Sequence, residues 1–133
     1  MSKGLSIAFK AVFYLYLAAV AVLCFGNFQS LPSVSSTILG IPTDKIVHFC
    51  MFFPFPILAF LAYDKFTGTR KSVIIFALIT FGAGCIIAAA TEIGQALLTD
   101  YRSGDHTDFI ADFLALLSSS LIATWLDLRK LSR

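Results

Sequence analysis

Four apolar runs, each about as long as a bilayer is thick, are the sequence feature that most limits how this chain can fold. They cover residues 5–25, 46–63, 72–98 and 107–126. An α-helix needs about 20 apolar residues to cross the hydrocarbon core of a bilayer, and it satisfies its own backbone hydrogen-bonding groups there. The sequence therefore predicts an all-α fold, a single domain over residues 1–133 that is an integral membrane bundle of four transmembrane helices.

The composition agrees with a membrane protein and disfavours other classes. Hydrophobic residues make up 58% of the chain and charged residues 14%, whereas soluble domains average about 25% charged residues. The net charge of +2 and the lack of a basic run with interleaved aromatic residues exclude a nucleic-acid partner. Cys24, Cys50 and Cys85 all fall inside apolar runs, so they predict neither a disulfide framework nor a metal site.

Two local features are expected in the first half of the chain. The first apolar run is long for a signal-peptide core, and no small-x-small cleavage site follows it, so we expect an anchored helix. Thr43 or Asp44 suits the N-cap of the second helix. Pro54 and Pro56 each remove a backbone donor from that helix, which predicts a kink near mid-membrane.

The distribution of basic residues predicts the orientation of the bundle. With four helices, the N-terminus, the loop at residues 64–71 and the C-terminus share one side of the membrane. That side carries eight of the ten Lys and Arg residues, and the other side carries Lys45 and Arg102. Because basic residues concentrate on the cytoplasmic side, both termini are expected in the cytoplasm.

A polar stretch at residues 92–112 covers the end of the third apolar run, the start of the fourth and the loop between them. We expect this stretch on the outer side of the membrane. Asp44, Lys45 and His48, at the start of the second helix, fall on the same side. Convergence of two polar segments that are far apart in the chain indicates a site. The residues that we predict to bind a ligand there are Asp44, Lys45, His48, Glu92, Gln95, Arg102, Asp105, Asp108 and Asp112.

Helix capping is the alternative explanation for some of these carboxylates, and it remains open for Asp44, Asp105 and Asp108. It fits Glu92 poorly, because this residue lies near a helix C-terminus, where the helix dipole disfavours an anion. Asp112 lies more than one turn inside an apolar run. Ionisable groups within a membrane cost about 2.5–3.5 kcal/mol on insertion scales and usually face a partner in the bundle interior. The sequence therefore favours a functional polar pocket.

The spacing of these polar residues resembles the pattern of the VanZ-like family. The pattern consists of Asp44-Lys45-x-x-His48, then Glu92-x-x-Gln95, then Arg102 followed by Asp105 and Asp108. The resemblance covers about residues 10–126, and it departs where Asp112 and Ala115 replace the Asn and Gly of the family pattern. It implies a small protein of the bacterial inner (cytoplasmic) membrane, since the founding member of the family is linked to resistance against the glycopeptide antibiotic teicoplanin.

Three classes of function follow from these observations. In the first, the outer pocket binds a lipid headgroup or a lipid-linked cell-wall precursor and lowers glycopeptide susceptibility, with phosphate held by Arg102 and Lys45. In the second, the chain is a metal-dependent membrane hydrolase that acts on a lipid-linked phosphate or ester, although the sequence has no nucleophile motif, P-loop or zinc-protease signature. A proton or ion pathway is the third, and the inner halves of the apolar runs carry few ionisable groups for it.

Overall fold

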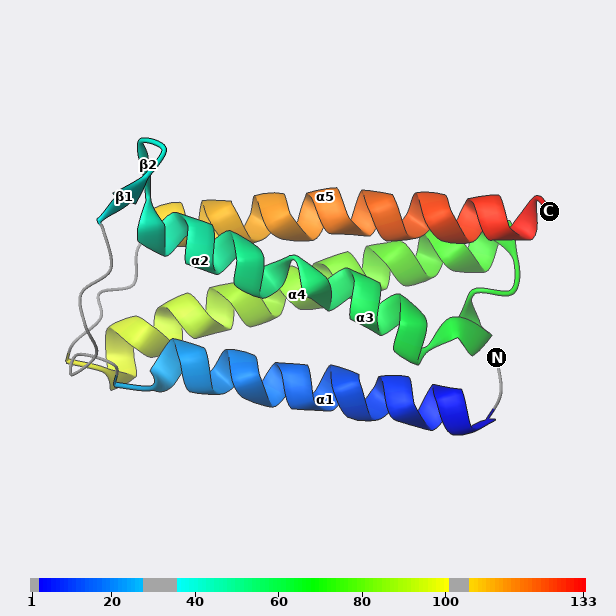
Figure 1. Ribbon diagram of the computed structural model, residues 1–133, viewed down its shortest axis with the longest axis horizontal. Helices are drawn as coiled ribbons and strands as arrows, with labels where there is room; N and C mark the ends of the chain where they lie inside the picture. The colour runs from blue at the N-terminus through cyan, green and yellow to red at the C-terminus, as the bar shows by residue number, and fades with distance from the viewer. Residues whose placement is uncertain (1–2, 28–35, 101–105) are drawn as a thin grey trace.

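The chain is an all-α bundle of four long helices, one of which is interrupted near its middle (Figure 1). The computed structural model describes residues 3–27, 36–100 and 106–133. A two-stranded antiparallel hairpin precedes the second long helix. The elements in chain order are α1 (Lys3–Phe25), β1 (Thr37–Ile38), β2 (Ile41–Pro42), α2 (Thr43–Phe52), α3 (Pro54–Ala62), the 3₁₀ helix η1 (Asp64–Phe66), α4 (Arg70–Leu98) and α5 (His106–Leu131).

Within the described ranges, four helical segments are long and apolar enough to cross a bilayer. They are Lys3–Phe25, Thr43–Ala62, Arg70–Leu98 and His106–Leu131. Many large apolar side chains on their outer faces are exposed, as expected for surfaces that contact lipid rather than water. The predicted fold class is thus confirmed, and the chain is a multi-pass membrane protein.

Helix α5 lies at the centre of the packing, in contact with α2, α3 and α4, while α1 packs on α3 and α4. Small residues allow α4 and α5 to approach closely. A Cβ atom added at Gly84 would lie 2.6 Å from a methyl group of Leu116, and Ala88 and Ala115 are fully buried. Close backbone approach through small residues is the usual means of association for membrane helices, because lipid provides no hydrophobic driving force between them.

The second span is interrupted between α2 and α3, at the place where the kink is predicted. Helix α2 ends at Phe52 and α3 begins at Pro54, with Phe53 as the junction. The predicted N-cap was wrong. Pro42 occupies that position without a side-chain cap, and the first helical N–H, that of Thr43, donates to the carbonyl of Ser36, the residue just before β1. The backbone ahead of the hairpin therefore satisfies one of the free N–H groups at the start of the helix.

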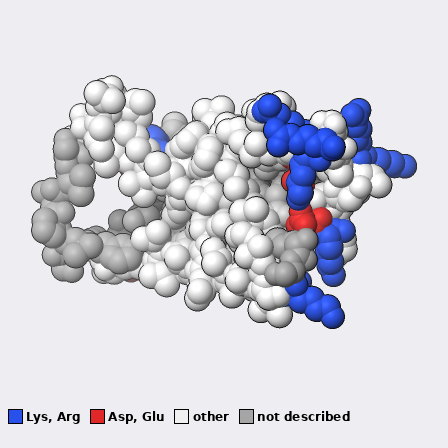
Figure 2. Space-filling view, turned by 45° about the vertical axis from the view of Figure 1, so that its right-hand side comes forward, with Lys and Arg blue, Asp and Glu red and all other residues white. Residues whose placement is uncertain are grey.

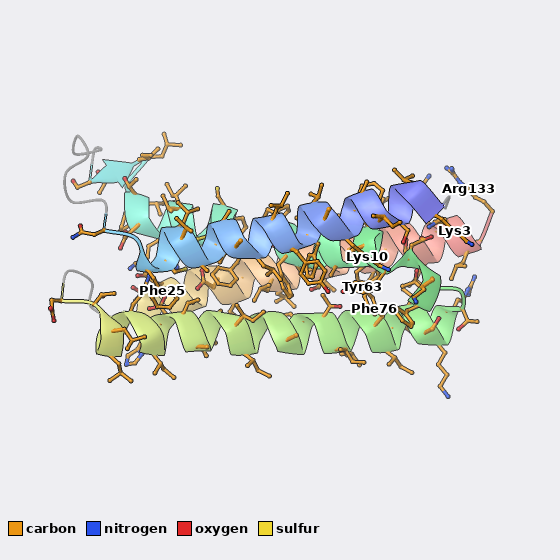
Figure 3. All side chains as sticks on the ribbon, turned by 90° about the horizontal axis from the view of Figure 1, so that it is seen from below. Lys3, Lys10, Phe25, Tyr63, Phe76 and Arg133 are labelled. Carbon is orange, nitrogen blue, oxygen red and sulfur yellow. The ribbon has the colours of Figure 1, made fainter. Side chains whose placement is uncertain are left out.

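The two ends of the bundle differ in charge. Lys and Arg side chains gather at the end where α1 begins and α5 finishes (Figure 2). At this end Lys10 lies over the ring of Tyr63, 5.7 Å from its centroid, as seen from below in Figure 3. A capping box formed by Thr69 and Ser72 begins α4 here. The opposite end carries the hairpin and the polar residues described next.

Candidate functional site

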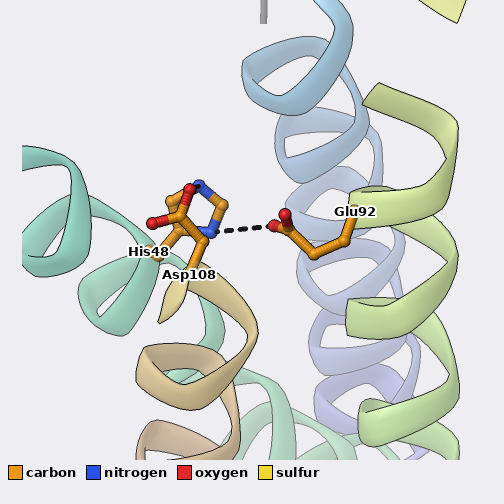
Figure 4. Close-up of side chains that lie close together, drawn as sticks. All are labelled: His48, Glu92 and Asp108. Carbon is orange, nitrogen blue, oxygen red and sulfur yellow. Dashed lines mark ion pairs between the residues drawn. The ribbon is translucent and has the colours of Figure 1, made fainter. Parts of the chain in front are cut away.

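Three helices bring buried polar side chains together at the end of the bundle that is opposite the termini. Figure 4 shows His48 from α2, Glu92 from α4 and Asp108 from α5. Asp112 also belongs to α5. Each of these four residues is less than a tenth exposed. The convergence predicted from the sequence is therefore observed, and it involves three helices. We call Lys45, His48, Glu92, Asp108 and Asp112 the polar cluster.

The imidazole of His48 lies at the centre of the polar cluster and is oriented by Asp112. Its Nδ1 lies 3.1 Å from Oδ1 and 3.4 Å from Oδ2 of the carboxylate. An ionised carboxylate only accepts hydrogen bonds, so Nδ1–H donates to Asp112, and in the neutral ring Nε2 then carries the lone pair. Asp112 is completely buried. A buried carboxylate holds the ring more firmly than an exposed carboxylate, which water can reach.

Two further carboxylates lie close to the imidazole. Oε1 of Glu92 is 3.7 Å from Nδ1, and Oδ2 of Asp108 is 3.7 Å from Nε2. Both separations are too long for a good hydrogen bond and short enough for a strong electrostatic interaction in a buried site. The cluster therefore surrounds one imidazole with three acidic side chains.

Lys45 links the polar cluster to the surface. Its ammonium forms an ion pair with Oδ1 of Asp108 and lies 3.0 Å from Oδ2 of Asp44. The two side chains of this second pair differ in exposure, since that of Asp44 is 56% exposed and that of Lys45 is 18% exposed. Asp44 thus lies at the rim and Lys45 at the entrance. The charge of Lys45 is largely balanced by carboxylates, which weakens the prediction that it holds a phosphate by itself.

Gln95 has a different environment from the one expected of a ligand-binding residue. It is 2% exposed, and its amide donates to the backbone carbonyl of Cys24 at the end of α1, at 2.9 Å. The ring of Phe25, the residue after Cys24, packs on Gly94. A Cβ atom added at Gly94 would lie 2.9 Å from two carbons of that ring. This contact ties α1 to α4. The predicted Arg102 and Asp105 lie outside the described residues.

An apolar groove of about 710 Å³ runs between α2 and α5 beside the polar cluster. Lys45 lines the groove and also pairs with Asp108, so the groove leads to the cluster. Its other walls are apolar apart from Thr107, and several of them are exposed on the outer surface of the bundle. The groove-lining residues are Ile41, Pro42, Lys45, Ile46, Phe49, Thr107, Ile110, Ala111 and Leu114.

Sequence reasoning missed this groove, because apolar residues inside apolar runs attract no notice. A signal was nevertheless present. Positions 42, 45, 46 and 49 on α2 and its cap, and positions 107, 110, 111 and 114 on α5, share the spacing i, i+3, i+4, i+7 of one helix face. What the sequence does not show is that these two faces lie next to each other.

Chemically, the site combines the buried, mainly acidic polar cluster with the apolar groove, which is open to the outer surface of the bundle. Such an arrangement suits an amphiphile, with a polar head among charged groups and an apolar tail along the helices. It also places a histidine with a fixed tautomer next to two carboxylates. Comparisons of the chain with protein-family models, with curated proteins and with solved structures found no match.

Proposed function

We propose that this chain is a VanZ-like protein of the bacterial inner membrane that binds a lipid headgroup or a lipid-linked cell-wall precursor. The head would lie in the polar cluster and the apolar chain in the groove between α2 and α5. The observation that carries this proposal is the position of Lys45, which lines the groove and pairs with Asp108 of the polar cluster. One ligand can therefore contact both.

The burial of the polar cluster also supports a binding role. Membrane proteins seldom place several ionisable groups inside spanning segments unless these groups act on a substrate or an ion. The polar cluster brings three carboxylates, one lysine and one histidine together from three helices.

The orientation of the chain would present this site to the outer leaflet. Basic side chains gather at the end of the bundle that carries the termini, and the positive-inside rule favours the cytoplasm for that end. The polar cluster would then lie at the depth of the outer headgroups, where lipid-linked cell-wall precursors and glycopeptide antibiotics meet. This location, with the resemblance to the VanZ-like family, supports an effect on teicoplanin susceptibility.

Thermal unfolding of the detergent-purified protein tests the binding proposal. A ligand that binds only the folded protein stabilises it, by about 2.7 kcal/mol at 100 times its dissociation constant. We expect polyprenyl phosphates or lipid-linked precursors to raise the melting temperature of the wild type. The shift should be lost in Asp108→Asn and kept in Asp44→Asn, because Asp108 is buried and Asp44 lies at the exposed rim. Equal shifts in both variants would contradict the proposal.

Antibiotic susceptibility provides the cellular readout. Cells that express the wild type should tolerate more teicoplanin than cells that express Asp108→Asn at the same membrane level. Asp44→Asn serves as the matched control and should behave like the wild type. If the wild type and Asp108→Asn give the same susceptibility, the glycopeptide part of the proposal is wrong, and the lipid-binding part still depends on the melting shifts.

A metal-dependent membrane hydrolase acting on a lipid-linked phosphate or ester is the second candidate, and the His48–Asp112 hydrogen bond favours it. A histidine whose Nδ1–H is held by a carboxylate can act as a general base through Nε2. A water molecule would give one proton to Nε2 and attack the phosphorus or carbonyl carbon. The bond to the leaving oxygen would break, and Nε2–H would return the proton to that oxygen. Release of phosphate or of the alcohol from such lipids, abolished in His48→Gln, tests this candidate. No release with any of these lipids would exclude it.

A further inference from the structure

The polar cluster has the donor set of a cation site. His48 offers an imidazole nitrogen, and Glu92 and Asp108 each offer a carboxylate oxygen. One ligand atom from each of the three residues lies within 4.8 Å of the others. Two ligands of one zinc-sized ion, each about 2.0–2.2 Å from it, lie at most about 4.4 Å apart. The 3.7 Å between Nε2 of His48 and Oδ2 of Asp108 is within that range.

A second, independent observation concerns the unused nitrogen of His48. The side chain is 5% exposed, and Asp112 binds its Nδ1. The other nitrogen, Nε2, makes no hydrogen bond to any described residue and is aimed at Asp108. A buried imidazole whose Nδ1–H is held by one carboxylate and whose Nε2 faces another, that of Asp108, has the arrangement of metal-bound histidines. In such sites the outer carboxylate fixes the tautomer and increases ligand basicity.

A divalent ion would also change what the polar cluster can bind. Glu92, Asp108 and Asp112 bring three carboxylates to the cluster. An ion held by two of these carboxylates could bind phosphate oxygens as well, because one divalent ion can bind carboxylates and phosphate together.

We propose that His48, Glu92 and Asp108 bind one divalent transition-metal ion, with Mn²⁺ or Zn²⁺ as the preferred ions. Imidazole suits zinc and related ions, and carboxylates also suit Mn²⁺. Asp112 is the positioning residue that holds the ring, and Lys45 binds the second oxygen of Asp108. The proposal deepens the proposed function, because the ion becomes the group to which an anionic lipid head binds, but it can be tested without any lipid.

The test is a titration of the metal-stripped, detergent-purified protein with Mn²⁺ and with Zn²⁺ in the absence of lipid. Calorimetry should show one ion per chain. Affinity should fall at least tenfold in Glu92→Gln and in Asp108→Asn, and about 10–100-fold in Asp112→Leu, the usual effect of losing an outer-shell partner. Asp64→Asn, in η1 at the opposite end of the bundle, should bind as tightly as the wild type. No saturable binding of either ion, or binding that none of the cluster variants weakens, would overturn the proposal.

A spectroscopic measurement on the wild type avoids the problem of a variant that fails to fold. Electron spin echo spectra of the Mn²⁺-loaded protein should show coupling to an imidazole nitrogen, and their absence would overturn the proposal. Lipid-induced melting shifts measured with and without chelator separate the two proposals. Ion binding without any lipid shift contradicts the proposed function alone, whereas a lipid shift in the chelated protein together with no ion binding contradicts the metal site alone.

Discussion

At the scale of single residues, the most informative contact is the hydrogen bond between His48 and Asp112. Asp112 is completely buried, more than one turn inside α5, and its two carboxylate oxygens lie 3.1 and 3.4 Å from Nδ1 of the imidazole. Loss of one partner from a buried charged pair is costly, because the other partner keeps its desolvation penalty. The polar cluster therefore depends on this carboxylate for its geometry, even though Asp112 is not one of the proposed metal ligands.

Substitution of Asp112 should separate its geometric role from its charge. Asp112→Leu leaves Nδ1–H of His48 without an acceptor and should lower the free energy of unfolding by roughly 1–3 kcal/mol. Asp112→Asn keeps a side-chain oxygen that can accept this hydrogen bond, so its loss should be clearly smaller. Thermal unfolding of the purified variants measures both. Equal losses would show that the hydrogen bond does not hold the ring.

At the residue scale, the sequence predicted which ionisable side chains lie together, but it did not predict the hydrogen-bonding partner of Gln95. His48, Glu92, Asp108 and Asp112 stand out because ionisable residues are rare inside apolar runs. The partner of Gln95 could not be predicted, because an amide that faces the bundle interior can pair with a ligand or with a backbone carbonyl. Which partner the amide finds depends on how α1 is rotated about its axis relative to α4. In this structure the rotation places the carbonyl of Cys24 next to the amide.

At the scale of helices, the close contact of α4 with α5 positions Glu92 relative to Asp108. Gly84 is the tightest point of this contact among the described glycines, with an added Cβ only 2.6 Å from Leu116. Gly84→Ala should therefore overpack the interface and cost about 1–3 kcal/mol of stability. The matched control is Gly82→Ala, where nothing lies within 4 Å of the added Cβ. Its melting temperature should be unchanged or slightly higher.

The contact of α1 with α4 gives a second prediction at this scale. Gln95→Leu removes the hydrogen bond to the carbonyl of Cys24 and should destabilise the folded protein by about 0.5–1.5 kcal/mol. Metal and lipid binding should remain, because the amide binds α1 rather than the polar cluster. Calorimetric titration of this variant next to Glu92→Gln checks the distinction, and loss of ion binding in Gln95→Leu would return Gln95 to the site.

The positions of the helices along the chain were largely predictable from the sequence, but which helices pack against each other was not. Apolar run length predicted all four spans to within a few residues, and Pro54 predicted the interruption between α2 and α3. The central place of α5 depends on which faces carry small residues that fit their counterparts, such as Gly84 against Leu116. Such a match between two helices is not apparent from the sequence of either helix alone.

At the scale of the whole molecule, the charge difference between the two ends of the bundle predicts the membrane orientation. In a variant without Cys24, Cys50 and Cys85, a new cysteine at Leu39, which is 99% exposed in the hairpin, should react with an impermeant maleimide on intact cells. A cysteine at Gly68, in the loop before α4, should react only after the membrane is opened. The reverse pattern would place the polar cluster on the cytoplasmic side and contradict the proposed outer-leaflet ligand.

The most direct test of the central claim is native mass spectrometry of the protein with its bound lipid. Ala111 lines the groove, so Ala111→Trp should fill it while leaving every residue of the polar cluster in place. Leu121→Trp, at a 64% exposed position of α5 away from the groove, is the matched control. We expect the wild type and Leu121→Trp to retain one lipid per chain and Ala111→Trp to lose at least nine-tenths of it, roughly a tenfold change in affinity. Undiminished lipid on Ala111→Trp would contradict a ligand that lies along the groove with its head in the polar cluster.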